Sequence, residues 1–131
     1  MLKGIPSILS PELLKVLCEM GHSDRIVIAD GNFPVESMGK NAKVVRLDGH
    51  GVPEILDAIL QVFPLDTYVE HPVNLMEVMP GDPVKTPIWD EYKEIISRHD
   101  GRGILSGSLF MKKQKLPMPL WQPEKWRCMP M

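Results

Sequence analysis

A histidine and an aspartate, His22 and Asp30, stand on either side of a short apolar run, Ile26 to Ala29, that predicts a buried strand. An imidazole gains and loses a proton near neutral pH, so the histidine could act as a general acid and base. A carboxylate accepts hydrogen bonds from hydroxyl groups and could orient a bound molecule. Gly31 and Asn32 follow the aspartate and predict a sharp turn, where α/β sheets commonly hold ligands. The sequence therefore predicts a site that uses both groups.

Simpler interpretations of these residues stay open. A histidine just past a helix often caps the last carbonyl groups, and the aspartate after the strand fits a plain turn. Asp24 fits a solvated loop charge, and Arg46 with Asp48 fits a local ion pair at a strand end. His50 has no partner at a diagnostic spacing, so we expect it to have a loop role.

Helical and strand patterns alternate along the chain. Ser10 as N-cap, Pro11 at the first helical position and Gly21 after the last turn delimit the first helix. The expected elements are a helix over 11–20, a strand over 26–29, a strand over 43–47, a helix over 53–63, a strand over 73–78 and a helix over 87–98. This order predicts an α/β protein with a single-domain layered fold, in which helices flank a mainly parallel sheet.

Size, charge and cysteine usage exclude several classes of protein. The chain has 131 residues, enough for one domain, and a formal net charge of −2. That charge gives no basic surface for nucleic acid or for a membrane, and no apolar run is long enough to span a bilayer. The start of the chain lacks a signal peptide core, so we expect a cytoplasmic protein. Cys18 and Cys128 have neither zinc-ligand nor disulfide spacing, and Cys18 fits a packing role.

The regular patterning ends near residues 101–103. Four prolines after this point argue against a sustained helix or a central strand, namely Pro117, Pro119, Pro123 and Pro130. Leu120, Trp121 and Trp126 are nevertheless too apolar for an ordinary solvated linker. Residues 101–131 therefore fit no regular structural class.

Several sequence words identify a family resemblance. They are Ser10-Pro11-Glu12-Leu13-Leu14, Met20-Gly21-His22-Ser23-Asp24, Ala29-Asp30-Gly31-Asn32-Phe33-Pro34, Arg46-Leu47-Asp48-Gly49 and Pro64-Leu65-Asp66-Thr67-Tyr68. Residues 1 to about 100 resemble the L-fucose mutarotase branch of the RbsD/FucU sugar mutarotase family. The Pro-Leu-Asp-Thr-Tyr and Met-Gly-His words favour this branch over the related ribose pyranases.

The resemblance implies an RbsD-like fold and an enzyme without cofactor or metal. Such an isomerase interconverts the α and β anomers of a monosaccharide, here L-fucose, and assembles as a homo-oligomeric ring, often a decamer, with sites near subunit boundaries. In the family pattern His22 is the acid/base residue and Asp30 contacts the sugar. Ring opening needs a proton removed from the anomeric hydroxyl and one delivered to the ring oxygen, and a single histidine could serve both steps.

The end of the chain departs from the family pattern. The resemblance implies an Arg-Phe-x-Phe-Tyr-Glu word and, near the end, Ala-Thr-Gly-Glu followed by Tyr-x-Asn, and none is present. When the last base of each codon is joined to the first two of the next, residues 110–131 can be reread as FYEEAKTAYAVVATGEMALYAN. We therefore expect a mutarotase core over 1–100, incomplete, and a frameshifted tail over 101–131, with the break near Asp100 to Ile104. A different gene end or a true variant is the alternative.

An altered tail predicts impaired function. It would remove family side chains from the pocket and strands from the sheet, which would leave sheet edges exposed. The principal hypothesis is thus an impaired L-fucose mutarotase. The alternatives are a D-ribose pyranase and a catalytically inactive relative that binds sugar or misfolds.

Overall fold

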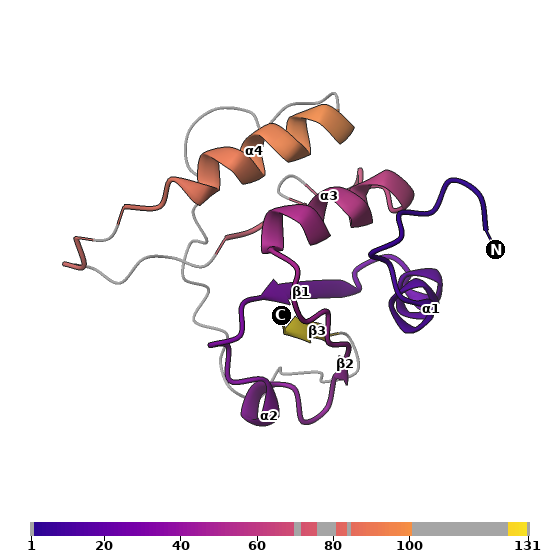
Figure 1. The fold of residues 1–131 in the computed structure, drawn as a ribbon, viewed down its shortest axis with the longest axis horizontal. Coiled ribbons are helices and arrows are strands. Elements are labelled where there is room, and N and C mark those ends of the chain that lie inside the picture. Colours follow the sequence, from indigo (N-terminus) through magenta and orange to yellow (C-terminus); the bar gives the residue numbers. More distant parts are fainter. Residues whose placement is uncertain (1, 70–71, 76–80, 84, 101–125, 131) are drawn as a thin grey trace. The chain divides into compact units, whose positions relative to one another are not determined.

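The computed structural model describes residues 2–69, 72–75, 81–83, 85–100 and 126–130 (Figure 1). They belong to two compact units. The first contains the chain through Phe63 together with residues 126–130, and the second contains the described residues from Pro64 to Asp100. His22 and Asp30 both lie in the first unit.

Helix α1, Pro11–Glu19, begins where the capping residues predict. The Ser10 hydroxyl oxygen accepts a hydrogen bond from the Leu13 N–H at 3.2 Å, which satisfies one of the free donors of the first turn. Leu13, Val16 and Leu17 recur at helical spacing and are buried. The burial of this stripe fixes the helix that leads to His22.

The other predicted helices also form. Helix α3 spans Val52–Val62 and α4 spans Ile88–His99, each within one residue of the expected bounds. A one-turn helix, α2 at Val35–Met38, was not predicted, because four residues are too few to show helical periodicity. It ends at Gly39, where a Cβ atom would lie 2.6 Å from the carbonyl oxygen of Val35. Helices and strands follow one another in mixed order, so the α/β class is confirmed.

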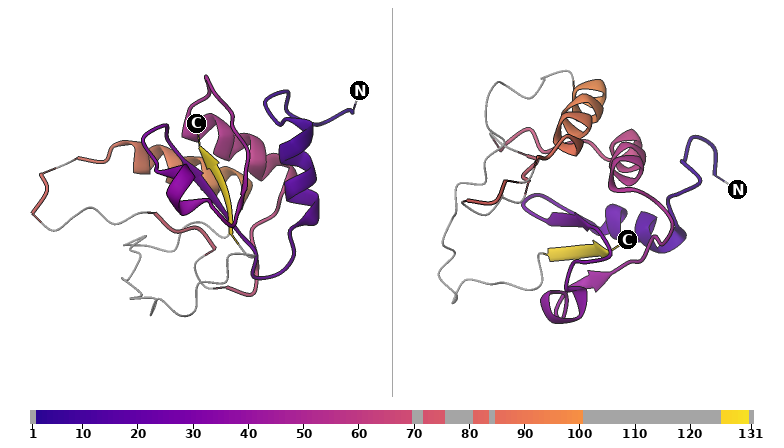
Figure 2. Two further views of the ribbon diagram at one scale, coloured as in Figure 1. Left: turned by 90° about the horizontal axis from the view of Figure 1, so that it is seen from below. Right: turned by 60° about the vertical axis from the view of Figure 1, so that its left-hand side comes forward.

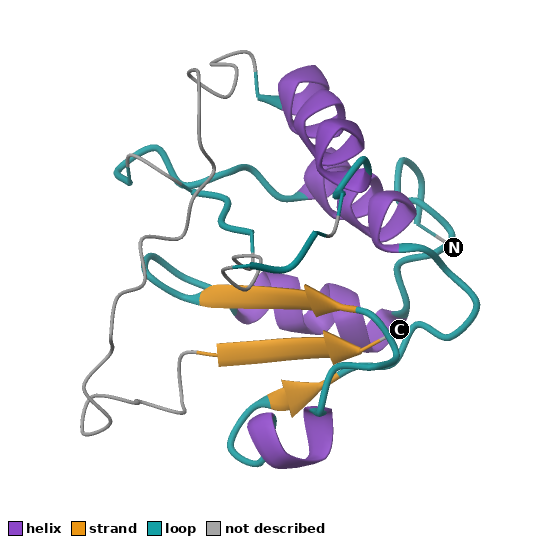
Figure 3. Ribbon diagram, turned by 90° about the vertical axis from the view of Figure 1, so that its left-hand side faces the viewer, coloured by secondary structure: helices purple, strands orange, loops and turns teal. Residues whose placement is uncertain are grey.

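A three-stranded sheet lies in the first unit. The strands are β1 at Arg25–Ala29, β2 at Lys43–Val44 and β3 at Trp126–Pro130, in the spatial order β1-β3-β2. Both pairings are parallel, and in Figure 3 the three arrows point the same way. β3 pairs with β1 along its whole length, from Arg25 opposite Trp126 to Ala29 opposite Pro130.

The place of β3 corrects two expectations about the tail. Pro130 was taken to exclude a central strand, yet residues 126–130 form the middle strand, drawn in yellow between β1 and β2 in the right-hand view of Figure 2. The proline is tolerated because it is the last strand residue and lies past the end of β2, so that it has one neighbouring strand only. Residues 126–130 of the tail therefore supply a strand, and the expected loss of strands is wrong for this position.

Strand β2 is shorter than the predicted strand over 43–47. It pairs through Lys43 opposite Arg127 and Val44 opposite Cys128. In the same register Arg46 would lie opposite Pro130, which has no N–H to donate to a ladder. Apolar residues beyond the paired segment are still buried, so the apolar pattern predicted burial correctly but overestimated the strand.

Of the predicted strand over 73–78, the described residues 73–75 form no regular strand, although Leu75 makes a single β-bridge, and residues 76–78 lie outside the described residues. The proposed break after Asp100 and tail residues 101–125 also lie outside them.

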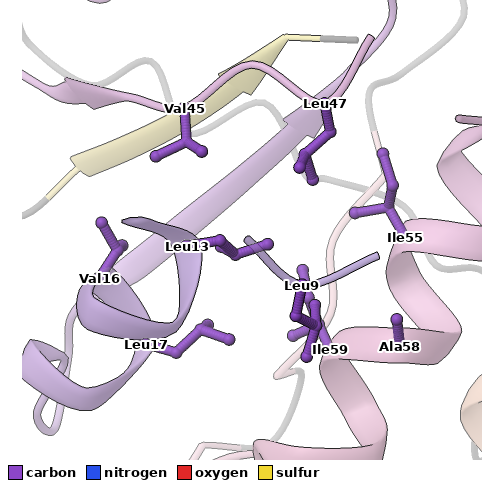
Figure 4. Close-up of a cluster of buried hydrophobic side chains, with 9 residues drawn as sticks. All are labelled: Leu9, Leu13, Val16, Leu17, Val45, Leu47, Ile55, Ala58 and Ile59. Atoms are coloured by element: carbon purple, nitrogen blue, oxygen red, sulfur yellow. The ribbon is translucent and has the colours of Figure 1, made fainter. Parts of the chain in front are cut away.

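One apolar core holds the first unit together (Figure 4). Its buried members are Leu9, Leu13, Val16, Leu17, Val45, Leu47, Ile55, Ala58 and Ile59. They come from α1 and the turn before it, from α3 and from the segment after β2, and Ile26 and Ile28 of β1 pack against them. The core thus anchors β1, whose two ends lead to His22 and Asp30.

Candidate active site

The two predicted chemical groups lie at opposite ends of β1. His22 is three residues before the strand and Asp30 is the residue after it, and both side chains are exposed. Figure 1 shows β1 running from the side of α1 toward the side of α2. A parallel strand rises about 3.3 Å per residue, so five residues separate the two ends by roughly 16 Å.

His22 lies in a tight turn between α1 and β1. The turn runs from Gly21 to Asp24, and the Asp24 N–H donates to the Gly21 carbonyl oxygen at 3.2 Å. In return Asp24 Oδ2 accepts a hydrogen bond from the Gly21 N–H at 2.9 Å. Ser23 has φ +69°, the left-handed region, as the third residue of a type II turn requires. Asp24 lies in the loop and is partly exposed, as expected, but its carboxylate also binds the backbone, which the sequence did not predict.

Asp30 is oriented by the turn that follows it. Its Oδ1 accepts the N–H of Asn32 at 2.9 Å, and its carbonyl oxygen accepts the N–H of Phe33 at 3.0 Å. The turn interpretation is thus confirmed, and it is compatible with a binding role. Within the described part of the chain no hydrogen bond to Oδ2 is formed, so one carboxylate oxygen can accept a bond from a ligand hydroxyl.

The predicted ion pair between Arg46 and Asp48 is confirmed. Arg46 Nη2 donates to Asp48 Oδ1 at 2.9 Å and Nε donates to Oδ2 at 3.3 Å. The hydrogen bond that Asp48 accepts, followed by its negative charge, raises the pKa of the Arg46 guanidinium. Both side chains are more than half exposed, so the pair is solvated and not part of an enclosed site.

Two further expectations are wrong. His50 lies in the loop before α3 as expected, but the expectation that it lacks a partner is wrong, because its Nδ1 lies 3.1 Å from Oε2 of Glu54, four residues along the chain. Cys18 is exposed on α1 and does not pack in the core. The spacing of His50 and Glu54 was readable in the sequence, whereas the outward direction of Cys18 depended on which face of α1 is buried.

Neither a metal site nor a membrane-spanning helix is found among the described residues. No three His, Cys, Asp or Glu side chains come together there as a metal site would require. None of the described helices combines the length and the hydropathy needed to cross a bilayer.

Comparison with known proteins places the chain in a family. The model of the RbsD / FucU transport protein family matches residues 3–116. The chain belongs to this family. The resemblance found in the sequence words is thereby confirmed, and the match reaches past residue 100 while leaving residues 117–131 outside.

Individual RbsD/FucU members are similar over most of the chain. A fucose mutarotase of Homo sapiens is 50% identical over 101 residues, which cover 74% of this chain and 66% of that protein. FucU from Bifidobacterium longum superposes with a TM-score of 0.79 at 57% identity and covers 98% of this chain and 87% of that one. A fucose mutarotase from Streptococcus pneumoniae, crystallised with L-fucose, gives a TM-score of 0.68 at 37% identity over 99% of this chain and 76% of that one.

The chain spans about two thirds of the length of its curated relatives. The structural alignments cover a larger share of it than the sequence alignment with the human relative, 98% against 74%.

Proposed function

We propose that this RbsD/FucU chain is an L-fucose mutarotase that interconverts the α and β anomers. The observation that carries the proposal is a pair of oriented polar groups, His22 and Asp30, in a chain that is 50% identical to a fucose mutarotase. The solved structure of a relative with L-fucose supports the same sugar. The catalytic role of His22 and the binding role of Asp30 are part of the proposal.

The proposed reaction is reversible ring opening. His22 takes the proton of the anomeric hydroxyl while the bond between the anomeric carbon and the ring oxygen breaks, and a proton is returned to that oxygen. The open chain has a carbonyl group at the anomeric carbon, which rotates and is attacked on its other face when the ring recloses. Protons and electrons balance, and the reaction requires no cofactor. Asp30 accepts hydrogen bonds from sugar hydroxyl groups and fixes the position of the ring.

The geometry of β1 favours a site completed by two subunits. Because β1 lies between them and its five residues span roughly 16 Å, we infer that His22 and Asp30 of one chain serve different sugar sites. In a closed ring of identical subunits, His22 of one copy can face Asp30 of the next. We therefore propose a homo-oligomeric ring, with the mainly parallel, RbsD-like sheet of the family in each subunit. We further propose a cytoplasmic location, which the free, exposed thiol of Cys18 supports.

The altered tail is proposed to impair the enzyme. Residues 101–131 lack the arginine, tyrosine and asparagine words that the family resemblance implies for the pocket. Rereading the nucleotide sequence around residues 100–104 tests the change of frame directly.

Exchange spectroscopy by NMR tests the activity, since it measures the rate at which α-L-fucose becomes β-L-fucose at equilibrium. We expect the full chain to accelerate exchange above the buffer rate, and His22→Ala to abolish the acceleration. His50→Ala is a matched control, because it removes a histidine that pairs with Glu54 and has no proposed role in catalysis. Unchanged exchange in His22→Ala would refute the catalytic role. Faster exchange of D-ribose than of L-fucose would assign the chain to the ribose pyranases.

A further inference from the structure

We propose that Asp24 is a positioning residue for His22. The inference rests on the proposed function, since it concerns the histidine assigned to proton transfer. It is carried by the turn that joins α1 to β1, in which both hydrogen bonds between Gly21 and Asp24 enclose His22 and Ser23.

The side chain of Asp24 adds a second hydrogen bond to the turn, beside the one between backbone groups. A turn of this kind is closed by one bond between its first and last residues, here from the Asp24 N–H to the Gly21 carbonyl oxygen at 3.2 Å. The second bond, from the Gly21 N–H to Asp24 Oδ2, is shorter at 2.9 Å and involves a charged acceptor. Together they fix both ends of the segment that carries the imidazole.

The backbone strain in the turn explains why this second hydrogen bond is needed. Ser23 is the sole non-glycine residue with positive φ in the described part of the chain, and a residue with a Cβ atom adopts this region at a cost in free energy. Such a conformation persists only where its surroundings hold it. The Asp24 carboxylate supplies that restraint next to His22.

The helix and the strand on either side of the turn are anchored, so a restraint on the turn also restrains the position of the His22 imidazole. α1 is anchored by Leu13 and Leu17 in the core, and Met20 ends it by donating its N–H to the Leu17 carbonyl oxygen at 3.3 Å. β1 begins at Arg25, directly after Asp24. Between two anchored elements, the turn sets where His22 leaves the backbone, and small displacements of a catalytic group lower rates strongly.

Three variants of the full chain test the proposal. Asp24→Ala removes the acceptor of the Gly21 N–H, whereas Asp24→Asn keeps a carbonyl oxygen that can accept the same bond. Ser10→Ala is the matched control: it removes a side-chain acceptor of a backbone N–H at the other end of α1, far along the chain from His22. All three are compared at equal concentration of folded protein.

The first readout does not depend on activity. Hydrogen exchange followed by mass spectrometry over residues 20–25 reports whether the Gly21 amide is held. We expect exchange in this segment to become about tenfold faster in Asp24→Ala and to remain unchanged in Asp24→Asn and Ser10→Ala. Unchanged protection in Asp24→Ala would overturn the proposal, whatever the activity of the chain.

The second readout is the split between kcat and KM for L-fucose. We expect Asp24→Ala to lower kcat by about tenfold or more with KM within about twofold, because a misplaced acid/base group slows chemistry more than binding. Asp24→Asn should recover most of kcat, and Ser10→Ala should retain it. Equal losses in Asp24→Ala and Asp24→Asn, or an equal loss in Ser10→Ala, would overturn the positioning role. Failure of His22→Ala to slow exchange would instead refute the proposed function, while the hydrogen-exchange result would still stand.

Discussion

A mixture of two inactive variants tests whether the sugar site is shared between subunits. His22→Ala and Asp30→Ala each remove one of the two proposed groups, and each variant alone should be inactive. The two residues are separated by β1, whose five residues span roughly 16 Å. If a site combines His22 of one chain with Asp30 of its neighbour, a ring built from both variants contains some sites with both groups intact.

The expected recovery follows from counting. In a closed ring assembled at random from equal amounts of the two variants, a site is intact when the His22 donor is an Asp30→Ala chain and its neighbour is a His22→Ala chain. This occurs at about one site in four, so exchange should recover to about a quarter of the unsubstituted rate. If both groups of one chain served the same site, every site would lack one group and recovery would be absent.

The matched control is a mixture of the unsubstituted chain with a double variant that carries both His22→Ala and Asp30→Ala. A shared site is then intact only where two unsubstituted chains are neighbours, again about one in four, whereas a site within one chain would be intact in about one half. The assay is NMR exchange between the anomers of L-fucose, with native mass spectrometry to show that the rings contain both chains. No recovery in the first mixture and one half in the second would refute a site completed across a subunit boundary.

Three other expectations can be measured directly. Replacing residues 110–131 by FYEEAKTAYAVVATGEMALYAN should raise the L-fucose exchange rate by about tenfold or more, because it restores family side chains that bind and orient substrate; no gain would contradict the impaired tail. Leu13→Ala should lower the free energy of unfolding by about 2–5 kcal/mol in urea titrations, since Leu13 is fully buried, whereas Leu2→Ala, at a site 73% exposed, should change it by less than about 0.5 kcal/mol. The folded pKa of Arg46 is raised, so its contribution to stability is fully present below the unfolded pKa and is lost only as the pH rises through the folded pKa, far above neutrality. The difference between Arg46→Met and the unsubstituted chain should be constant from about pH 6 to 9 and shrink with added salt, and a pH-dependent difference would contradict this assignment.

The helices were predictable because their signals are local. Ser10 and Pro11 mark the start of α1 through a single hydrogen bond and a preset φ angle, neither of which depends on the rest of the fold. α3 combines a proline in its first turn with an apolar stripe, and its bounds were equally predictable. The short helix α2 has too few residues to carry a period.

The sheet was harder to predict because strand pairing is long-range. Residues 126–130 show no alternating pattern that predicts a strand, and Pro130 argues against one. The register with β1 nevertheless places Pro130 at the end of the strand, where a proline is tolerated. The length of β2 depends on its pairing with the distant strand β3, which the sequence around Lys43 and Val44 does not reveal. The length and register of a strand can be predicted only when the strand that pairs with it is known.

The candidate site was predictable in part. The positions of His22 and Asp30 on either side of β1 followed from one apolar run bounded by turn residues. The role of Asp24 did not follow, because the same residue type between a helix and a strand is often solvated. Its bond to the Gly21 N–H becomes apparent only when the turn geometry and the positive φ of Ser23 are seen together.

The position of β3 indicates that an altered tail would impair this RbsD/FucU chain through its side chains and not through the loss of this strand. β3 is paired with the whole of β1, so the strand between His22 and Asp30 has a backbone partner from the tail. A parallel ladder depends on backbone groups and tolerates many side chains, whereas a sugar pocket depends on particular donors and acceptors. The expected deficit is therefore chemical: the tail supplies the strand that supports the site but lacks the family side chains that would line it. Restoring those side chains should then raise the exchange rate much more than it raises the free energy of unfolding, and equal gains in both would point to a defect of folding instead.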